Sequence, residues 1–188
     1  MEKHLFDFNK KTIVAIGIGV IIVTLVFMYM NIPTGIPETE IQAACGVGAF
    51  WAAIFGPIAG AVVGFVGHAI SDTLRSGSPW WSWAIASGVA GFLTGMVYPK
   101  LKLNVREFEK HDLIKFNLFQ IVGNGFAWII VAPILDIVLY QEPVKLVFKQ
   151  GLIAGMSNML STGLIGVLLL LLYVEIRSRW GITKQHDF

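Results

Sequence analysis

The chain has 188 residues, of which 55% are apolar or aromatic and only 14% are charged. Soluble domains carry about 25% charged residues, so this composition, with a mean hydropathy of +0.70, indicates a membrane protein. A net charge of only +2 argues against nucleic-acid binding. The single cysteine, Cys45, excludes a disulfide framework and a cysteine-rich metal site. We therefore expect one membrane domain with no metal and no cofactor.

Six apolar stretches predict an all-α bundle of six transmembrane helices that forms a single domain over residues 1–188. The first stretch is longer than the apolar region of a signal peptide and no small-x-small cleavage site follows it, so we expect it to be retained. Pro57 is suited to open the third helix, and Pro133 predicts a kink in the fifth. The expected spans are 12–30, 41–56, 57–74, 80–98, 116–140 and 148–174.

The basic residues are distributed unevenly between the two ends of the predicted bundle. With the amino terminus inside, the outer segments hold only three: Arg75, Lys145 and Lys149. The inner segments hold eleven: Lys3, Lys10, Lys11, Lys100, Lys102, Arg106, Lys110, Lys115, Arg177, Arg179 and Lys184. This positive-inside bias predicts that both termini are cytoplasmic.

The third predicted helix carries two titratable groups inside the apolar region. Gly56, Gly60 and Gly64 step by four residues toward His68 and Asp72. The glycines predict close contact with a neighbouring helix. The His68 and Asp72 pair either fixes the loop that follows or binds a ligand. Zinc would need more ligands than this pair supplies, so we expect no metal here.

The fourth predicted helix begins with three tryptophans, which an aromatic belt at the membrane interface also explains. Trp80, Trp83 and Ser87 share one face of that helix, because they follow i, i+3, i+7 spacing. Two indoles and a hydroxyl on one face can stack on a planar solute and donate hydrogen bonds to it. These residues are therefore candidates for substrate binding.

Polar side chains form a stripe on each of the last two helices. The two sets are Asn117, Gln120, Asn124 and Trp128 on the fifth helix, and Gln150, Ser157, Asn158 and Ser161 on the sixth. Facing stripes of this kind either satisfy each other or line a pocket for an uncharged ligand. The proline-containing loop 31–40 has no Lys or Arg, and it either covers the outer mouth of the bundle or is a plain solvated turn.

No motif for catalysis or nucleotide binding is present. The sequence has no phosphate-binding GxxxxGK[ST] loop, no GxSxG and no HExxH. Uphill transport would therefore take its energy from an ion gradient or from another subunit. Asp72 and Asp136 both lie near the outer end, which disfavours a proton relay and favours the second source.

Three segments together resemble a family of substrate-binding S components of energy-coupling factor (ECF) transporters. They are Phe55–Gly60 (FGPIAG), Gly64–Asp72 (GFVGHAISD) and Gly77–Trp83 (GSPWWSW). The GHAxxD motif followed by WWSW is the most specific part of the resemblance. It implies a prokaryotic cell-membrane subunit that is not an enzyme. Such a subunit captures a vitamin or a precursor from outside and releases it with a transmembrane coupling subunit and two cytoplasmic ATPases.

The resemblance also implies roles for individual residues. Small residues on the first helix, here Ala15 and Gly19, would dock on the coupling subunit; ordinary internal packing is the alternative. The ligand would lie in the outer half, where the candidates are Trp80, Trp83, Gln120, Asn124, Trp128 and Asn158, with His68 and Asp72 nearby. Aromatic faces and neutral amides suit a hydroxymethylpyrimidine related to thiamin, and cobalamin is a further candidate. A gradient-driven carrier or channel is the alternative function.

Overall fold

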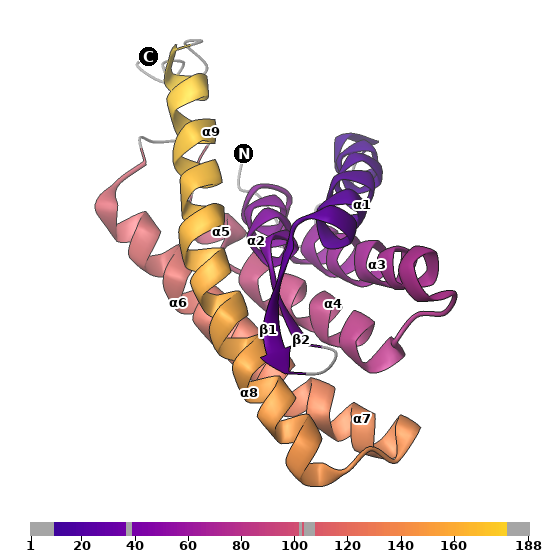
Figure 1. Ribbon diagram of the computed structural model, residues 1–188. Coiled ribbons are helices and arrows are strands. Elements are labelled where there is room, and N and C mark those ends of the chain that lie inside the picture. The colour runs from indigo at the N-terminus through magenta and orange to yellow at the C-terminus, as the bar shows by residue number, and fades with distance from the viewer. Residues whose placement is uncertain (1–9, 37–38, 102, 104–107, 180–188) are drawn as a thin grey trace.

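The computed structural model describes residues 10–36, 39–101, 103 and 108–179, and its helices form one elongated bundle (Figure 1). The helices are α1 (Lys10–Tyr29), α2 (Ala43–Phe55), α3 (Pro57–Ser76), α4 (Trp81–Gly95), α5 (Tyr98–Leu101), α6 (Lys110–Phe126), α7 (Ala132–Tyr140), α8 (Val144–Ser161) and α9 (Val167–Arg179). Two π-helical turns, η1 (Ala127–Val131) and η2 (Thr162–Gly166), join α6 to α7 and α8 to α9. The last two predicted spans are therefore single long helices with an irregular turn in each.

Four of the six predicted spans are helices long and apolar enough to cross a membrane. They are Lys10–Tyr29, Pro57–Ser76, Lys110–Tyr140 and Val144–Arg179. The other two are shorter than the roughly 20 residues that a bilayer requires, since α2 has 13 residues and α4 has 15. The fourth span was expected to continue to residue 98, but α4 ends at Gly95 and α5 is a separate turn.

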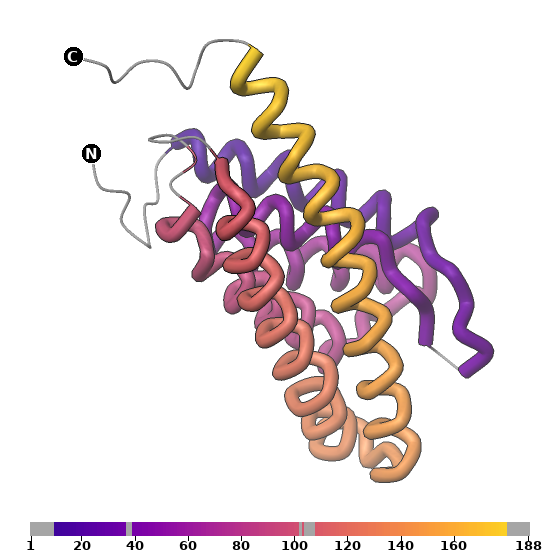
Figure 2. Tube along the Cα trace, turned by 90° about the vertical axis from the view of Figure 1, so that its left-hand side faces the viewer, coloured from indigo at the N-terminus to yellow at the C-terminus, as the bar shows by residue number. Residues whose placement is uncertain are grey.

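A two-stranded antiparallel hairpin, β1 (Asn31–Ile36) and β2 (Thr39–Gln42), joins α1 to α2. Asn31 pairs with Gln42, and Ile32 with Ile41. The sequence predicted a loop here and placed 41–42 in a helix, so the all-α prediction misses this hairpin. Pairing satisfies backbone groups that an irregular loop would leave open. The hairpin lies away from the end where α1 begins and α9 finishes (Figure 2).

Glycines bring α3 and α4 into close contact, as the sequence predicted. A Cβ atom on Gly64 would lie 2.5 Å from the carbonyl oxygen of Ser87, and one on Gly60 would clash with the backbone of Gly91. Backbone atoms of the two helices can approach this closely only because no side chains intervene. The tight contact fixes the position of α4 relative to α3.

Pro133 lies in the first turn of α7, directly after the π-helical turn η1. Proline has no backbone N–H, and its ring clashes with the carbonyl four residues earlier, here that of Ile129. A wider π turn at residues 127–131 accommodates this clash. The sequence predicted a kink at Pro133, and the structure has a π-helical turn directly before this residue. Trp128 lies within that turn.

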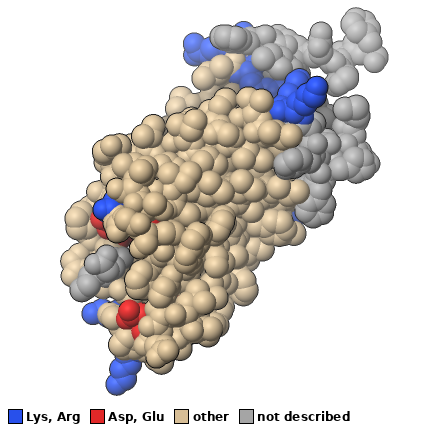
Figure 3. All heavy atoms as spheres, turned by 90° about the vertical axis from the view of Figure 1, so that its right-hand side faces the viewer, with Lys and Arg blue, Asp and Glu red and all other residues tan. Residues whose placement is uncertain are grey.

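The surface between the two ends of the bundle is apolar. Figure 3 shows a broad face without charged side chains between charged groups at the two ends. Large apolar side chains such as Ile13, Leu118 and Leu164 are mostly exposed on the helices. Apolar exposure of this extent is expected where lipid replaces water as the solvent.

Candidate functional site

A cavity of about 750 Å³ lies beside the β hairpin, and we call it the hairpin cavity. Its walls come from both strands, the carboxyl-terminal half of α3, the start of α4, Asp136 of α7, and the α7–α8 connection with the first turns of α8. Small-molecule sites in proteins typically occupy about 300–1,000 Å³. The hairpin cavity is therefore large enough for a vitamin-sized ligand.

Asp136 on α7 binds the start of α4 through three hydrogen bonds. The indole Nε1 atoms of Trp80 and Trp83 donate to its carboxylate at 2.7 and 2.9 Å, and the Ser82 hydroxyl donates to the same group. Hydrogen bonds to an ionised acceptor are the stronger class. The sequence analysis expected both indole N–H groups to donate to a ligand, but in the structure they donate to Asp136. Both tryptophan side chains still line the cavity.

The first backbone N–H groups of α4 also have side-chain acceptors. Asp72 Oδ2 accepts from the N–H of Trp80 at 3.0 Å, and the Tyr140 hydroxyl accepts from the N–H of Trp81 at 2.9 Å. The Tyr140 ring stacks on the Trp80 indole with 4.2 Å between centroids. Helix N-termini need such acceptors because their first N–H groups have no intrahelical partner. The indoles of Trp80 and Trp83 form the aromatic wall of the cavity. Side chains of α3 and α7 therefore both hold this wall in place.

His68 connects the cavity to the centre of the bundle. Its Nδ1 lies 2.6 Å from the Ser87 hydroxyl, its Nε2 lies 3.5 Å from Asp72 Oδ1, and its ring stacks on Phe27 at 4.4 Å. His68 and Asp72 both line the hairpin cavity. The pair therefore fixes the α3–α4 loop, which is one of the two sequence-based interpretations, and it also faces the cavity.

The hairpin is fastened to the bundle through β2. Arg75 on α3 forms a two-pronged ion pair with Glu40, with N–O distances of 3.0 and 3.1 Å. On the other side, the Ser161 hydroxyl of α8 donates to the carbonyl oxygen of Gln42 at 2.8 Å. Bidentate guanidinium–carboxylate pairs fix geometry as well as charge. The hairpin thus forms a wall of the cavity and is more than the plain solvated turn that was one expectation for this segment. Pro37 and Glu38 lie outside the described residues.

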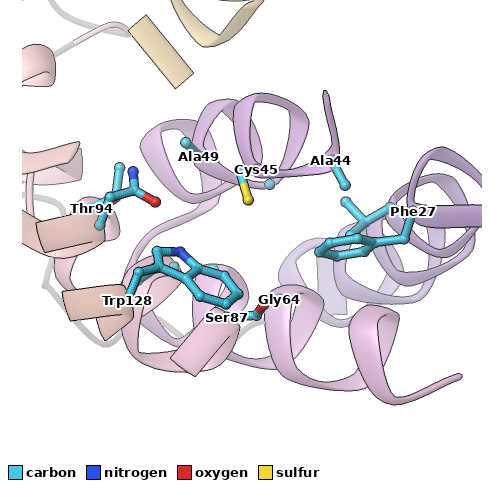
Figure 4. Close-up of a pocket in the computed structure, with 14 residues that line it drawn as sticks. Phe27, Ala44, Cys45, Ala49, Gly64, Ser87, Thr94 and Trp128 are labelled. Atoms are coloured by element: carbon cyan, nitrogen blue, oxygen red, sulfur yellow. The ribbon is translucent and has the colours of Figure 1, made fainter. Parts of the chain in front are cut away.

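A second, smaller cavity of about 30 Å³ lies at the centre of the bundle, and we call it the central cavity. Figure 4 shows the indole of Trp128 extending into it opposite Cys45, with Ser87 and Gly64 nearby. Trp128 is fully buried, and its Nε1 has no hydrogen-bond partner within the described part of the chain. This volume holds one or two water molecules, so the central cavity does not accommodate a vitamin.

The amides of the α6 stripe bond to one another and to the helix that they face. Gln120 Nε2 donates to Asn117 Oδ1 at 3.2 Å and to the Met159 carbonyl at 3.3 Å. Asn124 Nδ2 donates to the Gln120 side chain at 3.2 Å and to the Thr162 hydroxyl at 3.4 Å. The sequence left two alternatives for the polar stripes: they bond to each other, or they line a pocket for a ligand. The hydrogen bonds of these amide donors correspond to the first alternative.

Ala15 and Gly19 lie on the buried side of α1. The carbonyl oxygen of Ala15 accepts a hydrogen bond from Trp51 Nε1 at 2.9 Å. A Cβ atom on Gly19 would lie 2.6 Å from Trp51 Nε1 and 2.8 Å from Val63 Cγ2. The sequence left two roles for Ala15 and Gly19, docking on a coupling subunit or packing inside the bundle. The contacts that both residues make in this chain are those of internal packing.

The predicted site residues therefore separate into three groups. Trp80, Trp83, His68 and Asp72 line the hairpin cavity, whereas Asn124 and Trp128 line the central cavity. Gln120 and Asn158 line neither cavity, although both are buried. A helical stripe indicates which face is polar, but it does not indicate how deep in the bundle each member lies.

Sequence reasoning did not assign nine polar or charged residues of the cavity to the site: Thr39, Glu40, Gln42, Arg75, Ser76, Ser78, Asp136, Glu142 and Gln150. Asp136 offered a usable signal, because a carboxylate in a predicted span needs a partner. Gln150 was already recognised as part of the α8 polar stripe. Within the described ranges, no group of three or more His, Cys, Asp and Glu side chains could hold a metal ion.

Comparison with known proteins identifies the family. The family described as "ECF-type riboflavin transporter, S component" matches residues 7–175. A UPF0397 protein of Clostridium perfringens is 44% identical over 93% of this chain and 95% of its own. UPF0397 proteins of Enterococcus faecalis and Lacticaseibacillus casei are 42% and 40% identical, over 94% and 95% of this chain and 97% and 96% of their own. The chain belongs to the family of ECF-type riboflavin transporter S components, and it is therefore a multi-pass membrane protein that binds substrate and does not catalyse a reaction.

Proposed function

We propose that the hairpin cavity captures a heteroaromatic vitamin or vitamin precursor for ECF-driven uptake. The observation that carries the proposal is the cavity itself. It has a volume of about 750 Å³, the Trp80 and Trp83 indoles form part of its wall, and polar groups from β2, α3, α7, α8 and two connecting segments surround it. Aromatic faces supply apolar area to a planar ring system, and the polar groups orient it.

Riboflavin is the first substrate to test, because the description of the family names it. A hydroxymethylpyrimidine related to thiamin is the second, since it is also planar and rich in hydrogen-bonding groups. Cobalamin is far larger than either, so it would need the hairpin to move away from the cavity. We propose Trp80, Trp83, His68 and Asp72 as the residues of the predicted set that face the substrate.

In the proposed orientation, the hairpin end faces the outside and both termini are cytoplasmic. Of the basic residues in the predicted inner segments, Lys3, Lys102, Arg106 and Lys184 lie outside the described residues. The described ones include Lys10 and Lys11 at the start of α1 and Arg177 and Arg179 at the end of α9, where the positive-inside rule expects them. This orientation places the hairpin cavity where an extracellular substrate can reach it.

Energy in this proposal comes from partners. We propose a transmembrane coupling subunit and two cytoplasmic ATPases, because the chain carries no nucleotide-binding motif of its own. The whole chain acts as a single membrane domain in which capture takes place at the hairpin end.

The test measures binding first and transport second. Riboflavin fluorescence should be quenched when the vitamin is titrated with the purified chain in detergent, and thiamin, the hydroxymethylpyrimidine and cobalamin are then tested as competitors. If none of these compounds binds, the proposed substrate class is wrong.

Transport is then compared in proteoliposomes that contain the chain with and without the coupling subunit and ATPases. The proposal requires ATP-dependent uptake that appears only in the complete assembly. Uptake that is equally fast without any ATPase, and that an ionophore abolishes, would instead support a gradient-driven carrier or channel.

A further inference from the structure

The two tryptophans that line the hairpin cavity differ in how much of each ring is accessible. Trp80 is 42% exposed, whereas Trp83 is only 9% exposed. The Trp83 ring packs edge-on against Trp128, with 5.4 Å between centroids and an interplanar angle of 71°. Trp83 is thus a closely packed part of the aromatic wall, and Trp80 presents the larger aromatic surface.

The Trp80 indole is held at one edge and on one face. Its Nε1 donates to Asp136 at 2.7 Å, and the Tyr140 ring stacks on it with an interplanar angle of 29°. The Tyr140 hydroxyl also accepts from the backbone N–H of the next residue, Trp81. Because Trp80 remains partly exposed despite these contacts, its second face is accessible to a planar molecule.

Tyr140 lies behind this indole and not in the wall of the cavity. Trp80 lines the hairpin cavity, whereas Tyr140 does not. The face of the indole that Tyr140 covers is therefore turned away from the cavity, and the uncovered face is turned toward it.

From these observations we infer that the ring of the substrate stacks on the face of Trp80 opposite Tyr140, and that Tyr140 is a positioning residue that fixes the plane of this indole. The inference rests on the proposed function. It assigns the stacking to one of the two tryptophans, and it adds to the site a residue that does not face the substrate. A side chain that is already fixed in its bound orientation loses little conformational freedom on binding, so its preorganisation increases affinity.

The next residue along the chain provides a matched control. Trp81 is 47% exposed, close to the value for Trp80, but its ring stacks on Phe65 with 6.0 Å between centroids. Its side chain does not line the hairpin cavity. Loss of an exposed indole at Trp81 should therefore leave the affinity for the vitamin unchanged.

Three variants test the stacking, with the dissociation constant of riboflavin measured by isothermal titration calorimetry. Trp80→Leu and Trp80→Phe both lose the hydrogen bond to Asp136, but only the leucine lacks an aromatic face. We expect Trp80→Leu to bind riboflavin at least about tenfold more weakly than wild type. Trp80→Phe should recover at least about threefold of that loss, and Trp81→Leu should stay within about twofold of wild type. If thiamin alone binds to the wild-type chain, it replaces riboflavin as the probe.

Two variants test the positioning role of Tyr140. Tyr140→Phe keeps the ring that stacks on Trp80, and Tyr140→Leu removes it. We expect Tyr140→Leu to bind riboflavin severalfold more weakly and its saturated complex to be more fluorescent, because an indole quenches a flavin strongly only when the two rings stack closely. Tyr140→Phe should restore both properties. A role in stability alone would lower the free energy of unfolding and leave the fluorescence of the saturated complex at the wild-type value.

The outcomes separate the inference from the function on which it rests. If neither riboflavin nor thiamin binds to the wild-type chain, the proposed function fails and the inference fails with it. If the vitamin binds to wild type and Trp80→Leu binds it as tightly as Trp81→Leu does, the function stands and the stacking is overturned. The stacking is also overturned if Trp80→Phe binds as weakly as Trp80→Leu. If Tyr140→Leu matches Tyr140→Phe in affinity and in the fluorescence of the complex, Tyr140 does not position the indole.

Discussion

Two polar clusters lie inside this bundle, and only one of them faces a large cavity. Around Asp136, two indoles and a hydroxyl converge on one carboxylate beside a space of about 750 Å³. Around Gln120, the amides bond to each other and to Thr162, beside a space of only about 30 Å³. In this bundle a polar cluster therefore borders a space large enough for a ligand only where the surrounding helices stay apart.

Glycines of α8 allow close packing against the η1–α7 segment. Gly151 and Gly155 on α8 pack against Pro133 and Ile129, with ideal Cβ positions 2.6 and 2.8 Å from those side chains. At the hairpin end, β2 is fastened to α3 on one side and to α8 on the other. The hairpin thus lies between α3 and α8 and forms a wall of the cavity.

The largest expected effect follows from removing the carboxylate that holds the aromatic wall. Asp136→Ala leaves the buried indole N–H of Trp83, the part-buried indole N–H of Trp80 and the buried hydroxyl of Ser82 without their acceptor. We expect a loss of about 3–5 kcal/mol in the free energy of unfolding, and riboflavin binding at least about tenfold weaker because the wall loses its fixed position. Chemical unfolding in detergent and fluorescence titration measure the two effects.

Two further variants test that assignment. Asp136→Asn keeps one acceptor oxygen, so it should fall between wild type and Asp136→Ala in both measurements. Ser157→Ala removes a single hydrogen bond to the Ala154 carbonyl within α8 and should be nearly silent. An Asp136→Ala protein with wild-type stability would show that these hydrogen bonds do not hold the wall.

The closely packed part of the bundle is sensitive to added volume. Gly19→Leu would place a side chain against Trp51 and Val63, and overpacking of this kind costs about 1–3 kcal/mol. Gly17→Leu is the matched control, because no described atom beyond the neighbouring residues and backbone of α1 lies within 4 Å of the position of its Cβ. Thermal unfolding of the isolated chain should separate the two variants.

The same pair also tests the docking role that the sequence suggested for Ala15 and Gly19. A Gly19→Leu protein that is as stable as wild type, binds vitamin and yet fails to transport with the coupling subunit would favour docking. A protein that is already destabilised without any partner would instead show that Gly19 serves internal packing.

The sequence predicts the helices of this fold better than it predicts the site. Hydropathy located the long helices, and Pro133 marked the irregular turn, because both signals are local along the chain. The β hairpin was missed, since its pairing depends on how α1 and α2 are placed. Asp136 was noted as a carboxylate in a span, but its partners Trp80 and Trp83 lie more than 50 residues earlier, and periodicity cannot reveal contacts between helices.

The amide cluster should contribute to stability without contributing to binding. Asn124→Ala removes donors to Gln120 and Thr162, and we expect the free energy of unfolding to fall by about 0.6–2 kcal/mol. Vitamin affinity should change by less than about threefold, because Asn124 lines the central cavity and not the hairpin cavity. A large loss of affinity with unchanged stability would return Asn124 to the binding site.

The smallest effect on stability is expected at the hairpin, where the ion pair is partly exposed. Arg75 and Glu40 have side chains that are 38% and 27% exposed, and such pairs contribute only about 0–1 kcal/mol. Arg75→Gln should therefore leave unfolding almost unchanged but accelerate vitamin dissociation severalfold, because the hairpin then opens more easily. Stopped-flow fluorescence measures the rate, and the charge swap Arg75→Glu with Glu40→Arg should restore part of it. If the vitamin dissociates from the charge-swapped protein as fast as from Arg75→Gln, the ion pair does not hold the hairpin against the cavity. The hydrogen bond from Ser161 to Gln42 is then the next contact to test.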